Sequence, residues 1–142
     1  MIFPINKSEI QKVIPHRAPF LFVDEITSME DGKITAHYTF LPDNPIFEGH
    51  FPGNPVVPGV LQIEALGQAG AYSLLSLPEN KGKNAYLLKV SNARFKRVVR
   101  PGERLVLSVE KTRSFMNTAE CRAEATVDGE LAAECQLMCA IV

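Results

Sequence analysis

The chain has 142 residues, of which 46% are hydrophobic and 22% are charged, as in an ordinary folded protein. Its formal net charge of −1 gives no bulk attraction to nucleic acid or to an anionic membrane surface. We therefore expect a single domain spanning residues 1–142, which at this length can bury a core without metals or disulfides.

The three cysteines are Cys121, Cys135 and Cys139, and an odd number argues against a disulfide framework. Cys135 and Cys139 would share one face of a strand about 13 Å apart, which is too far for a disulfide bond. We expect buried thiols in a reducing compartment. The N-terminal residues lack the pattern of a signal peptide, and no apolar run reaches the ~20 residues of a membrane span. A cytoplasmic location is expected.

The first half of the chain predicts a short helix followed by a hairpin. Residues 8–14 (SEIQKVI) suit a helix that the next proline ends. Residues 20–40 contain two strand-like runs that flank Asp31 and Gly32, a pair that favours a type I′ turn. On the second run His37 falls on the polar face.

Residues 60–77 predict a helix that is apolar on almost every side and therefore buried. Its small residues Gly67, Gly70 and Ala71 would let a sheet approach closely. Residues 84–142 then read as strands with period-two alternation, which is typical of an antiparallel sheet, and turns between them are marked by Pro101-Gly102 and Asp128-Gly129. We expect an α+β fold in which a long antiparallel sheet curls around the helix, with a second copy of the chain completing its cover.

This apolar helix carries one carboxylate, that of Glu64, together with the polar side chains of Gln62, Gln68 and Ser73. Glu64 and Gln68 are four residues apart and so share a helix face. A buried carboxylate is costly unless it is paired or protonated. Glu64 therefore either reaches the surface or caps a backbone amide, or it stays protonated and can give a proton at neutral pH.

A rigid loop precedes the helix and carries His50. Prolines 52, 55 and 58 restrict this loop, which would hold the imidazole in a fixed place. His50 could equally be an ordinary hydrogen-bonded loop residue. Gly59 lies at the helix start, where free N–H groups and the helix dipole suit a developing oxyanion. A base, a protonated carboxyl and free amides together indicate proton abstraction beside a carbonyl, with loss or gain of a group at the next carbon.

The stretch GHFPGNPVVPGVLQIEALGQ resembles the signature of the bacterial (3R)-hydroxyacyl-[acyl-carrier-protein] dehydratases of fatty-acid synthesis. IPHRAPFLFVDEI is similar to the N-terminal segment of that family, and NARFKRVVRPGERL is similar to its basic strand and turn. The resemblance covers nearly the whole chain. It implies the hotdog fold, in which a sheet wraps around a long central helix.

The resemblance also implies an active site shared between two subunits, with His50 from one chain and Glu64 from the other. His50 would take the C2 proton, Glu64 would protonate the leaving hydroxyl, and the Gly59 N–H would steady the thioester oxygen. A trans-2-enoyl thioester would result, without a metal or redox cofactor. Because a related isomerising subgroup carries Asp at the Glu64 position, the glutamate favours the plain dehydratase. A homodimer is expected, and a hexamer built as a trimer of dimers stays open.

The basic residues Arg94, Lys96 and Arg97 suggest a docking patch for an acyl carrier protein and its phosphopantetheine-linked substrate. A solvated edge strand, on which lysine and arginine prevent aggregation, explains these residues equally well. RNA binding would require more positive charge and exposed stacking aromatics, so neither nucleic acid nor a membrane is an expected partner.

Leu88 and Lys89 stand where the family commonly has small residues and glycine, on a strand near its acyl tunnel. The acyl chain length and the choice between fatty-acid and related lipid pathways therefore stay open. Two other functions also remain: a hotdog acyl thioesterase and a non-catalytic module that binds acyl carrier protein. The remaining histidines, His16 and His37, have no comparable sequence context, and we interpret both as structural or exposed.

Overall fold

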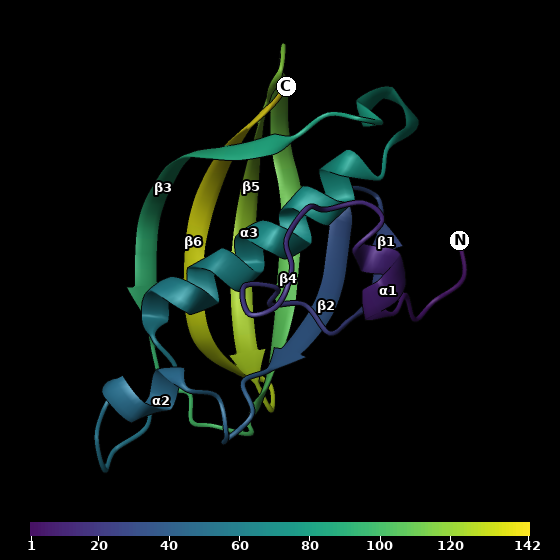
Figure 1. The fold of residues 1–142 in the computed structure, drawn as a ribbon. Helices are drawn as coiled ribbons and strands as arrows, with labels where there is room; N and C mark the ends of the chain where they lie inside the picture. The colour runs from purple at the N-terminus through teal and green to yellow at the C-terminus, as the bar shows by residue number, and fades with distance from the viewer.

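The computed structural model describes residues 1–142, and its strands form one continuous sheet (Figure 1). The helices are α1 (Lys7–Ile10), α2 (Ile46–Gly49) and α3 (Gly59–Leu75), with a 3₁₀ turn at Pro78–Asn80. The strands are β1 (Glu25–Glu30), β2 (Lys33–Thr39), β3 (Ala85–Phe95), β4 (Arg104–Phe115), β5 (Thr118–Val127) and β6 (Glu130–Ile141). Neighbouring strands are antiparallel, in the order β1-β2-β4-β5-β6-β3.

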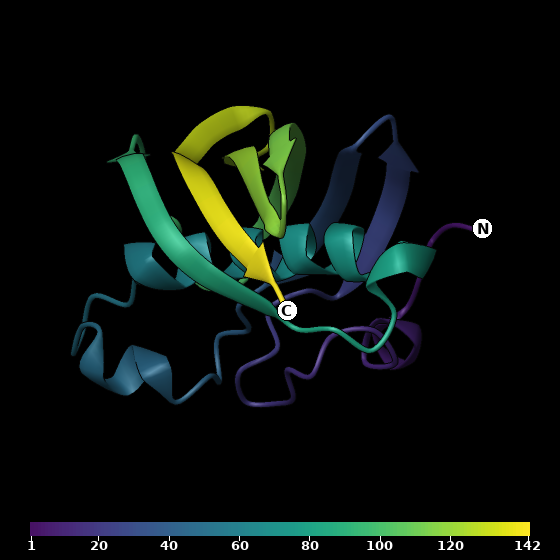
Figure 2. The ribbon, with the colours of Figure 1, turned by 90° about the horizontal axis from the view of Figure 1, so that it is seen from above.

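The sheet curves around α3, as the view from above shows (Figure 2). α2 and the segment between α1 and β1 lie on the opposite side of that helix. The side chains between α3 and the sheet form a single apolar core, in which Leu66 and Leu107 have no exposed surface. A long helix inside a curved antiparallel sheet is the hotdog fold, so the predicted fold is confirmed.

Both predicted Asp-Gly turns form as the sequence indicates. Asp31 and Gly32 have φ of 49° and 79°, and Asp128 and Gly129 have φ of 50° and 80°. A type I′ turn requires positive φ at both central residues, which aspartate tolerates and glycine adopts freely. These turns fix the register of the β1–β2 and β5–β6 hairpins.

The first arm of the first hairpin is shorter than predicted, because β1 begins only at Glu25. The residues before it are tied to α3, since the N–H of Phe22 donates to Gln68 Oε1 at 2.7 Å. His37 lies on the face predicted to be polar but is only 7% exposed, because its Nε2 lies 3.0 Å from Glu25 Oε1. His37 is therefore structural and not exposed.

Most residues of α3 are buried, and none of the helices has both the length and the apolar character needed to span a membrane. A Cβ at Gly70 would lie 3.2 Å from Val109 Cγ1, which confirms that a small residue lets the sheet approach there. The same prediction is wrong for Gly67, where a Cβ would meet nothing within 4 Å. Val60, Glu64 and Gly67 form a stripe at helical spacing that the chain does not fully cover.

β3 forms one edge of the sheet and pairs only with β6. The other edge, β1, is protected by Ile5, whose backbone exchanges two hydrogen bonds with Ile26. Nothing comparable pairs with β3, although its large apolar side chains are between 47% and 56% exposed: Tyr86, Leu87, Leu88 and Phe95. A long apolar edge of this kind is typical of an interface with another chain.

The three cysteines are free and buried in the core, as predicted. Burial raises the pKa of both Cys121 and Cys135 from 9.0 to about 11, because the thiolate would lose its hydration in the apolar interior. The folded protein therefore holds these protons more tightly than the unfolded chain does.

We expect the free energy of unfolding to fall as the pH rises from 9.0 to about 11, the interval between the unfolded and folded pKa values of these thiols. Their contribution is fully present below this interval and is lost as the pH rises through it. Urea unfolding across this pH range measures the effect. A Cys121→Ala, Cys135→Ala double variant should lose less stability than the wild type over the same interval, and an equal loss would assign the alkaline effect to other groups.

Candidate active site

His50 is held by the turn that its motif forms after α2. Its C=O accepts a hydrogen bond from the N–H of Val56 at 3.0 Å, and its Nδ1 lies 3.0 Å from the carbonyl oxygen of Val56. Because a carbonyl oxygen only accepts, Nδ1 carries the hydrogen and Nε2 keeps its lone pair. The imidazole is thus oriented as a base whose free nitrogen is Nε2.

The rest of the turn supports this orientation. Phe51 and Asn54 exchange two backbone hydrogen bonds, of 3.2 and 2.9 Å, and the Phe51 ring stacks on the imidazole with 4.0 Å between ring centroids. The guanidinium of Arg100 donates to Asn54 Oδ1 at 3.1 Å, which links the turn to the chain beyond β3. The side chain of His50 is therefore fixed by contacts on several sides, as the proline-rich sequence predicts.

Glu64 lies in the second turn of α3, and its side chain is 29% exposed. Its Oε2 accepts a hydrogen bond of 2.9 Å from Gln68 Nε2, and the Nε2 of His16 lies 3.6 Å from the same oxygen. Glu64 thus reaches the surface in part without capping a backbone amide. Because Oε2 accepts from Gln68, Oε1 is the oxygen that stays free to face a ligand.

Gly59 begins α3, and its N–H makes no hydrogen bond to the protein. Pro58 provides no side-chain cap, so the first N–H groups of the helix stay available. A Cβ at residue 59 would lie 2.7 Å from Cε1 of Phe95, which means that the aromatic ring from the end of β3 packs directly on this glycine. A free N–H at a helix start, where the helix dipole is positive, is suited to an anionic oxygen.

The single chain does not join His50 to Glu64, which form no ion pair with each other. His50 belongs to the turn between α2 and α3 and is held by Val56. Glu64 faces the N-terminal segment through His16 and Gln68. We call these two groups of candidate residues half-sites, and they lie at separate positions along the same helix-loop unit.

Residues 14–136 match the family model of a FabA-like domain. The chain belongs to the FabA-like family. This range includes every residue of both half-sites, so the features described above lie within the part of the chain that is common to the family.

Curated members of this family are similar to the chain over nearly its whole length. It is 49% identical to the 3-hydroxyacyl-[acyl-carrier-protein] dehydratase FabZ of Clostridium novyi over 134 residues, which cover 94% of each protein. It is 46% identical to the FabZ of Oceanobacillus iheyensis, with 96% of this chain and 99% of that protein covered. The corresponding FabZ of Chloroflexus aggregans is 47% identical, with 96% of each covered.

Solved structures support the fold alone. The dehydratase heterocomplex ApeI:P of Xenorhabdus doucetiae superimposes with a TM-score of 0.77 at 18% identity, over 99% of this chain and 91% of that chain. A thioesterase-like protein of Ralstonia eutropha superimposes with a TM-score of 0.65 at 21% identity, over 82% and 83% of the two chains. Hotdog proteins with different chemistries share this architecture, so the fold does not choose among them.

The basic residues are placed less uniformly than the sequence suggests. Arg94 and Lys96 are exposed at the end of β3. Arg97 is half-buried, and its guanidinium lies 2.8 Å from Glu103 and 3.5 Å from Glu130. The backbone N–H of Arg100, and then Arg97, hold the pKa of the Glu103 carboxyl below its usual value. Arg97 therefore stabilises the turn after β3 and is only partly available to a partner.

Sequence reasoning missed the place of His16 in this family member. It lies against Glu64 although the two residues are far apart in the chain. The available signal is the segment PHRAP, in which two prolines restrict the backbone around His16 and Arg17. No periodicity of that segment indicates which part of α3 it crosses, so only the tertiary structure reveals the contact.

Proposed function

We propose that this FabA-like protein removes water from (3R)-hydroxyacyl thioesters of acyl carrier protein to give trans-2-enoyl thioesters, in fatty-acid or related lipid biosynthesis. The observation that supports this most strongly is that one chain carries both a free Nε2 on His50 and a free Oε1 on Glu64. These two groups occur in a chain that is 49% identical to a 3-hydroxyacyl-[acyl-carrier-protein] dehydratase. Because its thiols are free and buried, we assign the protein to the cytoplasm.

In the proposed reaction His50 Nε2 takes the proton from C2, and the electron pair of that C–H bond becomes the C2–C3 double bond. The N–H of Gly59 donates to the thioester oxygen, where negative charge develops. Glu64 gives the proton on Oε1 to the hydroxyl at C3, whose C–O bond then breaks to release water. The base and the acid act on neighbouring carbons, so they must approach the substrate from two sides.

We also propose that each site is formed by two subunits, with His50 from one chain and Glu64 from its partner. The unpaired β3 edge with its exposed apolar side chains supports an interface at this edge. Val60, 73% exposed on the uncovered stripe of α3, would be buried by the same partner. Pairing through the β3 edge extends the sheet and gives two identical sites related by a twofold axis.

The exposed cations Arg94 and Lys96 are our candidates for binding an acidic carrier protein, while Arg97 stabilises the turn after β3. An acidic partner is attracted to exposed cations that are not already neutralised by carboxylates. Arg97 has two carboxylates within ion-pair distance, so its share in docking is the smaller one.

The catalytic roles can be separated by the leaving group. We expect His50→Ala and Glu64→Gln each to lower turnover of a 3-hydroxyacyl thioester by roughly 10²–10⁴-fold, the usual contribution of acid–base groups. A 3-chloroacyl analogue loses chloride, which needs no proton. On the chloro analogue, Glu64→Gln should therefore retain most of the wild-type turnover. His50→Ala should lose turnover on both the hydroxyl and the chloro substrate.

Mass spectrometry of the products completes this test. A dehydratase yields the thioester minus one water, whereas a thioesterase yields the free acid and a bare carrier protein, and a binding module yields neither. Free acid as the main product would contradict the proposed reaction. If Glu64→Gln lost turnover equally on the hydroxyl and the chloro substrate, Glu64 would not be the acid.

The shared site can be tested by combining inactive subunits. Purified heterodimers of a His50→Ala chain and a Glu64→Gln chain should recover about half of the wild-type activity, because one of two sites then has both residues intact. Co-expression with two different affinity tags gives such heterodimers. Homodimers carried through the same steps are the control, and heterodimers as inactive as these would place both residues of a site in one chain.

The docking patch can be tested by charge reversal. An Arg94→Glu, Lys96→Glu variant should raise KM for a carrier-bound substrate about tenfold or more and leave KM for a small pantetheine thioester unchanged, since only the carrier presents an acidic surface. Lys33→Glu, at an exposed position of the opposite hairpin, is the matched control. A similar rise in KM with both substrates would show that the change acts on the catalytic site.

A further inference from the structure

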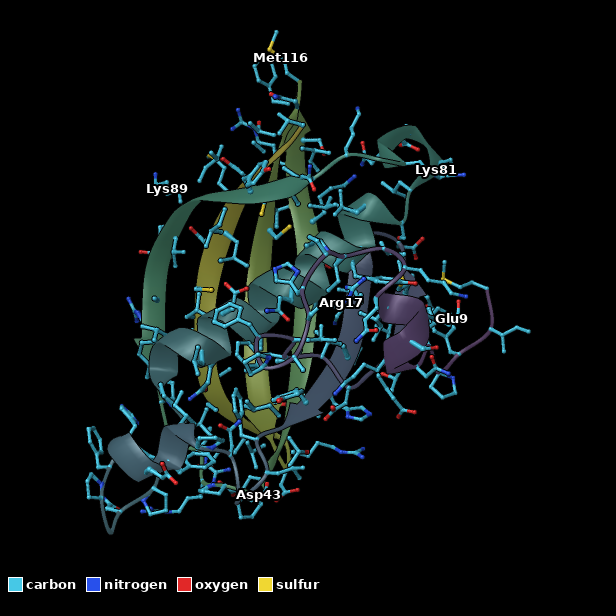
Figure 3. All side chains as sticks on the ribbon, in the orientation of Figure 1. Glu9, Arg17, Asp43, Lys81, Lys89 and Met116 are labelled. Carbon is cyan, nitrogen blue, oxygen red and sulfur yellow. The ribbon has the colours of Figure 1, made fainter.

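The segment between α1 and β1 crosses α3 on the side away from the sheet, and it carries His16 to Glu64 (Figures 1 and 2). Its backbone is braced by Arg17, which is labelled on this crossing in Figure 3. The guanidinium of Arg17 donates to the carbonyl oxygens of Gln11, Ile14 and His16 at 2.9, 3.0 and 2.7 Å. Gln68 Nε2 also donates to the carbonyl oxygen of Phe20 at 3.0 Å. The Cα of His16 is thus fixed between two anchored points.

The ring of His16 has no other polar partner in the chain. Its Nε2 lies 3.6 Å from Glu64 Oε2, which is longer than a hydrogen bond, and its buried Nδ1 has no hydrogen-bond partner. The one polar group near the ring is therefore the carboxylate of the candidate acid, which lies on another element. From this position, a small movement of the ring would bring Nε2 within hydrogen-bond distance of Glu64 Oε2.

We propose that His16 is a positioning residue that donates its Nε2 hydrogen to Glu64 Oε2 as Glu64 gives up its proton. This rests on the proposed role of Glu64 as the acid. When the proton on Oε1 passes to the leaving hydroxyl, the carboxyl becomes an anion. A second N–H on Oε2, added to that of Gln68, stabilises the anion more than the neutral acid.

The interaction is thus stronger in the transition state than in the ground state, which lowers the barrier without tightening substrate binding. A 3.6 Å separation in the free protein is compatible with this role, because catalytic hydrogen bonds often tighten only when substrate is bound. Fixing both donors on Oε2 also keeps Oε1 directed at the substrate. His16 itself exchanges no proton with the substrate.

Two substitutions separate the donor from the shape of the ring. His16→Phe keeps an aromatic ring without a donor, and His16→Gln supplies an N–H donor without the ring. We expect His16→Phe to lower kcat for the 3-hydroxyacyl thioester by about 10–100-fold, the usual effect of removing a residue that orients a reactive group, with KM changed less than about twofold. His16→Gln should retain most of kcat. A packing role predicts the opposite order.

The leaving group gives the second readout. Because chloride needs no proton, His16→Phe should turn over the 3-chloroacyl analogue at the wild-type rate. In a Glu64→Gln background, the additional substitution His16→Phe should change the residual turnover less than about twofold, since its effect passes through Glu64. If circular dichroism shows that a variant does not fold, His16→Ala replaces His16→Phe and His16→Asn replaces His16→Gln.

His37 provides a matched control. It also lies against a glutamate, with Nε2 3.0 Å from Glu25 Oε1, and its Nδ1 is also buried without a partner. His37→Phe should lower the melting temperature and leave kcat unchanged, because Glu25 has no part in the proposed reaction. A kcat loss in His37→Phe as large as that in His16→Phe would mean that both act through stability, which overturns the proposal.

The outcomes distinguish this inference from the function on which it rests. If Glu64→Gln is inactive on the hydroxyl substrate and His16→Phe is fully active, His16 has no positioning role and the proposed acid stands. If Glu64→Gln keeps its hydroxyl activity, the assignment of the acid is wrong, and the inference fails with it. Equal losses by His16→Phe on the hydroxyl and chloro substrates also overturn the inference.

Discussion

The buried side-chain amide of Gln68 holds together the parts of the chain on which the candidate site depends. It accepts a hydrogen bond from the N–H of Phe22 and donates to the carbonyl oxygen of Phe20 and to Glu64 Oε2. Only 1% of the residue is exposed, so water could not replace these contacts if the amide were lost. One side chain therefore decides where the N-terminal segment crosses α3 and which oxygen of Glu64 stays free.

The same crossing explains why the chain departs from simple strand formation before β1. Residues 20–23 are apolar enough to extend a hairpin, but their backbone groups bond to α3 instead of to β2. Leu21, Phe22 and Val23 still enter the core. A few hydrogen bonds of a β1–β2 ladder are therefore absent here. In their place, a polar connection spans the buried helix and places the N-terminal segment beside Glu64.

A single chain leaves a coherent part of its surface incomplete. The stripe of α3 that carries Glu64 and the apolar β3 edge are both uncovered, whereas the β1 edge is closed by Ile5. His50 and Glu64 are each oriented within their own chain but are not brought together by it. The partner chain that we propose would complete both the apolar cover and the candidate pair His50 and Glu64, and so would satisfy these features at once.

Periodicity and turn chemistry, which are local properties of the chain, predicted by themselves an antiparallel sheet curled around a buried helix and the two Asp-Gly turns. The resemblance of one long motif to a known family implied the hotdog fold and the candidate pair His50 and Glu64. The sequence could not place His16, separate Arg97 from Arg94, or show that Gly67 faces away from the sheet. The places of His16 and Arg97 depend on contacts between residues distant in the sequence, His16 with Glu64 and Arg97 with Glu130. Only the tertiary structure decides them, because the crossing of one segment over another is set by packing and by buried hydrogen bonds.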